Sequence, residues 1–251
     1  MDESANSLHG VEIIGVSPIP VNERVMSPGK VFIFWSMASA SALTPLIAYL
    51  LNGMGLIYIL VAFAISFCIG LLPAGIFSEM GRKTPVPALV ISRKTYGYAT
   101  SSAFSLVFTF VNLGWFGLND VTGGLILASV THTESWIWFF FMAAFQIILV
   151  IFGAKYLEKF YRYTSAVLIA SYLILAYFLF SSYHISMSSA IFPTSSFSWG
   201  SAIGIILAFS ILAWAYKIST ITRFARSSYA SEEKSEKIKF FVASPVGIMV
   251  P

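Results

Sequence analysis

The stretch VNLGWFGLND, residues 111–120, places polar and aromatic side chains inside a run of almost uncharged residues. At about 3.6 residues per turn, Asn112, Trp115 and Asn119 share one face of a helix. Because each amide that faces hydrocarbon costs roughly 2–7 kcal/mol, this face should look into a helix bundle or a wet cavity. Two readings stay open: amides that join helices by hydrogen bonds, or a site for a flat polar ring that stacks on Trp115.

Asp120 lies on a neighbouring strip of the same predicted helix, together with Gly117 and Gly124. Glycines let another helix approach closely, so the carboxyl group should be buried against a neighbour. A buried carboxyl group tends to stay protonated unless it is paired. Asp120 is therefore either a group that carries a proton or a structural hydrogen-bond donor.

The elements that carry these residues are membrane-spanning helices. The 251-residue chain is 57% hydrophobic and 10% charged, and its mean hydropathy is +0.81, outside the range of soluble domains. A bilayer core about 30 Å thick needs roughly 20 apolar residues per helix. Six stretches meet this need: residues 31–52, 55–78, 102–130, 136–153, 163–183 and 199–222.

The distribution of Lys and Arg predicts the orientation of these helices. The segments NGMG, THTES and HISMSSAIFPTSSF contain no Lys or Arg, whereas the segments on the other side contain all of them except Lys217. The positive-inside rule then predicts a multi-pass protein of the cell membrane with a cytoplasmic N-terminus. The polar first thirty residues lack a charged start followed by a short apolar core, which predicts no cleavable signal peptide. The predicted parts are a cytoplasmic segment 1–30, helices one to six over 31–223, a cytoplasmic loop 224–239 and the start of a seventh helix, 240–251. The pI of 9.1 follows from this arrangement and needs no nucleic-acid partner.

The first and sixth spans contain features that interrupt a helix or charge its face. In the first span, the small-residue run MASASALTP ends in Pro45, which predicts either an unwound segment or a kink. In the sixth, Ser210, Trp214 and Lys217 share one face. Lys217 lies about 27 Å along that helix, so its ammonium either reaches the membrane boundary or forms a fixed positive charge in a cavity.

Several of these segments together resemble the nucleobase–cation symporter-1 family, which includes permeases for cytosine, purines, hydantoins and allantoin. The resemblance covers residues 25–230 and is carried by SASALT in the first span, SRKTYG after the second, GWFG in the third, GAKYLEKFYRYT before the fifth and TITRFAR at the end of the sixth. It implies an all-α membrane protein of the leucine-transporter type, in which two five-helix repeats are inverted and helices one and six are broken.

The resemblance also implies roles for residues of the first and third spans. Trp115 matches an aromatic residue that stacks on the substrate ring, and Asn112 and Asn119 match polar residues beside it. Backbone carbonyls at Ala38 and Ser41 match part of a sodium site.

Ser39 and Trp214 complete the expected substrate-binding set, and Asp120 and Lys217 the expected coupling set. Two positions depart from the family pattern. An expected aromatic residue of the sixth helix aligns with Ile211 instead of Trp214, and an expected aspartate aligns with Thr220.

Carriers of this type have ten to twelve spans, so the chain corresponds to the first half of the fold. The stretch SPVGIMVP stops within an unfinished span and favours a truncated carrier. A fragment, an interrupted or split gene, and an assembly with a second chain all remain open, with the C-terminal half on the same gene or a second chain.

We therefore expect a secondary transporter, and not an enzyme, that imports a planar nucleobase-like heterocycle with sodium or protons and uses no organic cofactor. The alternatives are an amino-acid or amine carrier in which Lys217 replaces sodium, and a non-transporting membrane subunit. An enzyme is disfavoured because His9, His132 and His184 lie outside the spans and no HExxH motif occurs.

Overall fold

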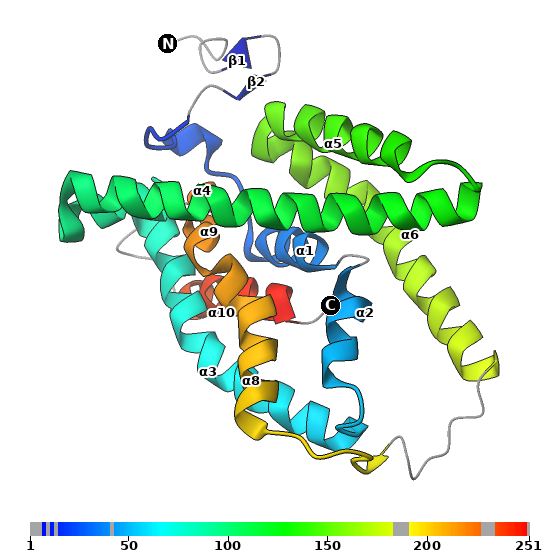
Figure 1. Cartoon of the computed structure of the whole chain (residues 1–251). Helices are drawn as coiled ribbons and strands as arrows, with labels where there is room; N and C mark the ends of the chain where they lie inside the picture. Colours follow the sequence, from blue (N-terminus) through cyan, green and yellow to red (C-terminus); the bar gives the residue numbers. More distant parts are fainter. Residues whose placement is uncertain are drawn as a thin grey trace.

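The computed structural model describes residues 7–8, 11–12, 15–40, 43–182, 191–226 and 234–249. In these ranges the regular secondary structure is helical apart from a hairpin of β1 (Ser7–Leu8) and β2 (Val11–Glu12) and an isolated bridge. The α-helices are α1 (Pro28–Ser39), α2 (Leu43–Ala48), α3 (Leu56–Lys83), α4 (Ala88–Thr131), α5 (Ser135–Ile151), α6 (Gly153–Ser182), α8 (Trp199–Leu207), α9 (Ala213–Thr222) and α10 (Lys234–Met249), as Figure 1 shows. Short helices η2 (Val21–Glu23) and η3 (Tyr49–Leu51) and the wide turn η4 (Ala208–Leu212) complete the set.

Helices cover the six stretches that the sequence predicts to be spans, with two changes of boundary. Four stretches are long and apolar enough to cross a membrane: Leu56–Lys83, Ala88–Thr131, Tyr156–Ser182 and Trp199–Thr222. The fourth span is the 17-residue α5, and the first is divided into α1 and α2. The run GAKYLEKFYRYT belongs to α6 instead of a loop, because Glu158 pairs with Arg162 one helical turn on. Similarly, α10 begins at Lys234, inside the loop predicted over 224–239.

The first span is interrupted, as its small residues and proline predict. Helix α1 ends at Ser39 and α2 begins at Leu43. Pro45 lies in the first turn of α2, where the N–H that proline lacks would have no partner within the helix. The proline therefore belongs to the start of a second helix and is not a kink inside one.

The sixth span is continuous, in contrast to the broken helix that the family resemblance implies. Helices α8 and α9 are joined by η4, one turn of wider π-helix. A π-turn contains one extra residue and so changes the direction of the side chains around it. Ile211 in this turn is fully buried against Gly70 of α3, whereas Phe209 contacts α4.

Most of the helices form two groups, and α6 contacts both of them, through α1 and through α5. Helices α1, α3, α8, α9 and α10 share one core. Its members include Phe34, Trp35, Ile211, Ile218, Phe240 and Ile248. Helices α4 and α5 pack on each other. Helix α4 lies across the first group and contacts it mainly through α9 (Figure 1). The contact between α4 and the sixth span is therefore the place where the two groups meet near the polar stripe.

A stripe of small residues on α3 sets how closely the first group packs. Ala62, Ser66, Gly70, Ala74, Ser78 and Gly81 are buried at intervals of three or four residues. A Cβ atom added to Gly81 would lie 2.5 Å from the carbonyl oxygen of Ser219 in α9. The hydroxyl of Ser78 lies 2.8 Å from the carbonyl oxygen of Phe240 and donates to it, which joins α3 to α10.

Residues 15–27 form hydrogen bonds with the segments that follow α3 and α9. The backbone of Met26 pairs with that of Ala225, and the Ile19 N–H donates to the Pro85 carbonyl at 3.0 Å. The Arg223 guanidinium donates to the carbonyl oxygen of Gly15 at 2.7 Å. These contacts hold the N-terminal segment against the first group of helices.

We expect Gly81→Ala to lower the free energy of unfolding by about 1–3 kcal/mol, because the added methyl overlaps the α9 backbone. The thermal unfolding midpoint of the protein in detergent measures this change. Gly204→Ala is the matched control, since nothing lies within 4 Å of its added Cβ. The control should be neutral or stabilising by up to about 1 kcal/mol. Equal midpoints for the two variants would contradict the packing described for α3.

Candidate substrate and cation site

Trp115 lies on the face of α4 that meets the sixth span, and it is half-buried. The Phe209 ring of η4 stands perpendicular to it, with 5.6 Å between the ring centroids. Edge-to-face contacts of this kind are favourable for aromatic pairs. Two rings from different helix groups thus face each other across the contact between those groups.

The other polar residues next to Trp115 bond to their own helix. The Asn119 amide donates to the carbonyl oxygen of Trp115 at 2.8 Å, and the Thr122 hydroxyl donates to that of Leu118 at 2.8 Å. Such local bonds satisfy polar groups where no other partner is present. The amide oxygen of Asn119 can still accept a hydrogen bond beside the Trp115 ring.

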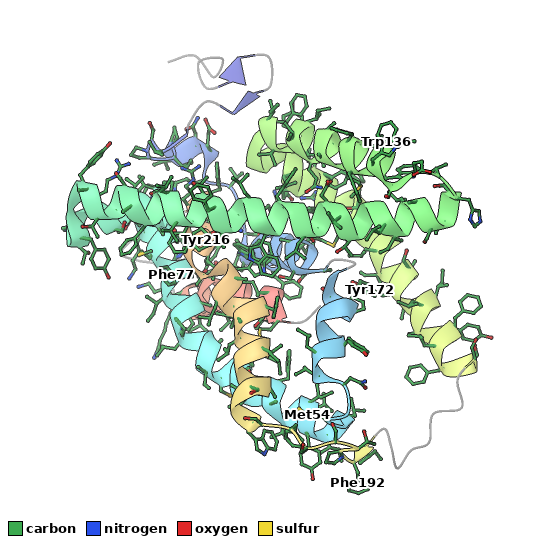
Figure 2. The ribbon with its side chains drawn as sticks, in the orientation of Figure 1. Met54, Phe77, Trp136, Tyr172, Phe192 and Tyr216 are labelled. Carbon is green, nitrogen blue, oxygen red and sulfur yellow. The ribbon has the colours of Figure 1, made fainter. Side chains whose placement is uncertain are left out.

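Asn112 has a different environment, because it joins α4 to α9. The Tyr216 hydroxyl, on the side chain labelled in Figure 2, donates to the Asn112 amide oxygen at 2.7 Å. Phe108, one turn away, stacks on the Tyr216 ring with centroids 4.0 Å apart and planes 19° apart. Asn112 thus forms an interhelical hydrogen bond, the first of the two alternatives for this polar face. Sequence reasoning did not identify its partner, Tyr216. A phenol in an apolar span is a signal that could have drawn attention to it.

Trp214 and Lys217 lie together on α9, away from Trp115. The Trp214 ring meets Trp35 of α1 at 5.7 Å, and the Lys217 ammonium lies 4.7 Å from the Trp214 ring. The same ammonium lies 5.5 Å from the Tyr216 ring, so two aromatic faces surround the charge. Lys217 has no acidic partner within the described part of the chain.

Asp120 is buried against α5, as its glycine strip predicts. Its side chain is 8% exposed, and Gln146 of α5 donates to its carboxyl at 3.4 Å. One turn on, Gly124 allows the Phe139 ring to approach, because an added Cβ would lie 2.4 Å from that ring. The structure therefore places Asp120 at the packing surface between α4 and α5, with α5 as its neighbour.

The end of α1 collects polar atoms beside the break in the first span. The Ala40 N–H donates to the Ser36 carbonyl at 3.0 Å, and the Thr44 hydroxyl donates to the Ser39 carbonyl at 3.3 Å. The buried hydroxyls of Ser36 and Ser39 have no hydrogen-bond partner among the described residues. Carbonyl groups at a helix C-terminus carry a partial negative charge, which favours a cation.

The two predicted carbonyl ligands of the cation are Ala38 and Ser41. Ala38, in the last turn of α1, packs against the core of the first group. Ser41 lies outside the described residues. The carbonyl group of Ala38 thus lies beside the break.

A cavity of about 340 Å³ lies next to this break, between α2, α3, the sixth span and the end of α10. Its polar walls are Ser39, Thr44 and Ser210, and Phe63 and Phe209 are its aromatic walls. Phe209 belongs both to this cavity and to the contact with Trp115. The structure therefore links Trp115, Phe209 and Ser39 through one side chain, whereas Trp214, Lys217 and Asp120 lie elsewhere.

Comparison with known families identifies the chain. The family described as "permease for cytosine/purines, uracil, thiamine, allantoin" matches residues 18–250. The chain belongs to this family of permeases.

The similar proteins are described as transporters. The vitamin B6 transporter TPN1 of Saccharomyces cerevisiae is 28% identical over 175 residues, which cover 66% of this chain and 30% of the yeast protein. The solved structure of Mhp1, described as a nucleobase-cation-symport-1 family transporter in a closed conformation with bromovinylhydantoin bound, matches with a TM-score of 0.82 at 17% identity. That match covers 94% of this chain and 54% of Mhp1. The chain thus has the first half of a leucine-transporter-type fold, and its match spans 30% of the yeast transporter.

A double-mutant cycle tests the contact between α4 and α9. Tyr216→Phe and Asn112→Leu should show a coupling energy of about 0.5–1.5 kcal/mol in unfolding experiments, the net value of one hydrogen bond. In the control cycle, Tyr216→Phe with Asn119→Leu, the coupling should be near zero, because Asn119 bonds to its own helix. A larger coupling in the control cycle would refute the assignment of Asn112 as the partner of Tyr216.

Proposed function

We propose that the chain is the N-terminal part of a secondary active transporter that imports a planar, nucleobase-like heterocycle together with sodium or protons. The observation that carries the proposal is the perpendicular contact of Trp115 with Phe209, between two helix groups and beside a cavity. Membership of the permease family and the hydantoin bound by Mhp1 support the class of substrate.

In the proposed bound state, the heterocycle lies flat on the Trp115 ring in the place of the Phe209 edge. A face of an aromatic ring stacks on any planar heterocycle, so the contact supplies affinity without choosing one ring. The Asn119 amide supplies the choice, because its oxygen accepts from a ring N–H. Asn112 remains bonded to Tyr216 next to the site, and the hydroxyls of Ser39 and Ser210 provide further polar contacts on the cavity side.

For coupling to sodium, we place the ion at the end of α1. The carbonyl groups of Ala38 and Ser41 would be its ligands, because unwound backbone beside a helix C-terminus commonly holds a cation in transporters. A cation at this position would join α1 to α2 and so preorganise the cavity wall that carries Ser39 and Thr44. Substrate affinity and cation affinity would then be linked through the same break.

Asp120 and Lys217 have supporting parts in this proposal. The bond from Gln146 to Asp120 favours a structural role, in which the carboxyl holds α4 against α5. The rings of Trp214 and Tyr216 accommodate the Lys217 charge next to the cavity helices, which leaves the cation at α1 as the coupling ion.

The transport cycle needs a unit that moves against the first group of helices. Alternating access requires one helix group to move against another around a fixed site, and the second group here consists of α4 and α5. We propose that further helices, on the same gene or on a second chain, complete that group. The N-terminus lies in the cytoplasm, as the Lys and Arg distribution predicts.

Trp115→Ala should weaken binding of the transported heterocycle by about 5- to 150-fold, because base stacking on an aromatic ring contributes about 1–3 kcal/mol. Equilibrium binding of radiolabelled candidate heterocycles, such as cytosine and hydantoin, measures this loss. Trp136→Ala is the matched control, because that indole is 60% exposed at the far end of α5 (Figure 2). Unchanged affinity in Trp115→Ala would remove the stacking role.

Coupling can be tested in proteoliposomes of the carrier with imposed ion gradients. An inward gradient of sodium or protons should drive accumulation, and collapsing both gradients with ionophores should abolish it. Lys217→Gln should retain this dependence, because the coupling cation is assigned to α1. Accumulation in the wild type that is insensitive to sodium but depends steeply on pH would favour the carrier in which Lys217 replaces sodium. Accumulation that survives loss of both gradients would contradict coupled transport.

A further inference from the structure

Helix α4 begins with a short stretch, residues 88–96, that is bent away from its long straight part (Figure 1). The bend occurs at Gly97, where φ is +77° and ψ is 172°. Nothing lies within 4 Å of a Cβ added to this glycine, so its backbone conformation, and not a lack of space, requires the residue. The sequence thus encodes a short helix that is separate in direction from the spanning part of α4.

Contacts across the bend hold the short helix in place. The Ser92 hydroxyl donates to that of Ser101 at 2.9 Å, and Ser101 is buried. Tyr96 meets Phe104 edge-on with centroids 5.6 Å apart. Since each contact joins one side of Gly97 to the other, the short helix is a fixed platform at the start of the spanning helix.

The platform and the adjacent end of α3 present positive charge. Lys83, Arg93 and Lys94 are exposed, and none of the three has an acidic partner in the described part of the chain. The sequence contains no Asp or Glu between Glu79 and Asp120. We call Lys83, Arg93 and Lys94 the basic face.

Two tyrosines accompany the basic face. Tyr96 and Tyr98 are 58% and 70% exposed, and the Arg93 guanidinium lies 5.0 Å from the Tyr98 ring. Tyrosine favours the boundary between lipid and water, where its ring and its hydroxyl meet different surroundings. The platform therefore combines positive charge with the side chains of a membrane boundary.

We propose that the basic face binds the phosphate-containing headgroups of anionic phospholipids. Each Lys or Arg close to an anionic membrane surface strengthens binding by about fivefold. A phospholipid, in preference to a soluble phosphate, fits because the exposed tyrosine rings also need an apolar boundary. The proposal requires α4 to span the membrane, but it is independent of the substrate and the coupling ion.

The test measures the phospholipids that remain bound to the purified chain. The protein is placed in bilayers of equal parts phosphatidylcholine and phosphatidylglycerol, extracted with mild detergent, and its bound lipids are titrated and counted by native mass spectrometry. Wild type should retain phosphatidylglycerol in preference to phosphatidylcholine. Lys83→Gln, Arg93→Gln and Lys94→Gln together should weaken this binding roughly hundredfold, as three fivefold steps predict.

The matched control removes equal charge from the exposed start of α10. Lys234→Gln, Lys237→Gln and Lys239→Gln together should weaken binding by at most about 25-fold, two fivefold steps, because Glu236 already lies 3.5 Å from the Lys239 ammonium. Equal losses in the two triple variants would overturn the proposal, since retention would then follow net charge alone. The single variant Arg93→Gln should lose about fivefold and serves if the triple variant fails to fold.

Two further arms separate the sources of phosphate and the contribution of the tyrosines. Inorganic phosphate, at matched ionic strength, should not displace phosphatidylglycerol, and displacement would overturn the proposal in favour of a soluble anion. Tyr96→Leu with Tyr98→Leu keeps all three charges and should still lower lipid affinity severalfold; unchanged affinity would also contradict it. Because no transported substrate is present, failure here leaves the proposed transport function untouched.

Discussion

The contact between α4 and the sixth span is the constraint on which the rest of the structure depends. Polar groups that lie within a membrane have no water to satisfy them, so they must satisfy one another or a ligand. Asn112 and Tyr216 do so by a hydrogen bond across the two helices, and one turn along α4 the Trp115 and Phe209 rings meet edge-to-face. The first pair fixes how α4 lies on α9, and the second leaves an aromatic face that a substrate ring can use.

The geometry of this contact is set by residues that take no part in it. The π-turn at Ala208–Leu212 lets neighbouring side chains point in different directions, so that Ile211 is buried on α3 while Phe209 faces α4. Ile211 can lie there because Gly70 provides the space, as part of the small-residue stripe on α3. Close packing inside one helix group thus positions the ring that the second group meets.

Much of the fold could be predicted because the membrane restricts it. Uninterrupted apolar runs identified the spans, and the run ending in Pro45 indicated the break between α1 and α2, because both signals are local. The start of α6 was missed, since a charged stretch in a helix looks like a loop unless the pairing of Glu158 with Arg162 is considered. The burial of Asp120 against a neighbouring helix was predicted from glycine spacing, which is also a local signal, but the spacing did not identify α5 as that helix.

The site itself could be predicted only in part. The face that carries Trp115 and Asn119 follows from helical periodicity, but its partner on the sixth span does not. The family resemblance implies Trp214 or Ile211 for that role, whereas the ring that meets Trp115 is Phe209, within the π-turn. The π-turn accompanies the packing of Ile211 on Gly70 of α3, and a pattern within the sixth span alone cannot reveal that packing.

The central claim is that the Trp115 face of α4 lines an aqueous site and not the lipid. Single cysteines at positions 112, 115 and 119, in a Cys68→Ser background, can be reacted with a membrane-impermeant thiol reagent. Cysteines at Leu113, Leu118 and Leu125, whose side chains are exposed on other faces of α4, serve as lipid-facing references. The account predicts labelling at the first three positions, slowed by the transported heterocycle, and none at the references. Labelling of the references with no reaction at 112, 115 and 119 would contradict it.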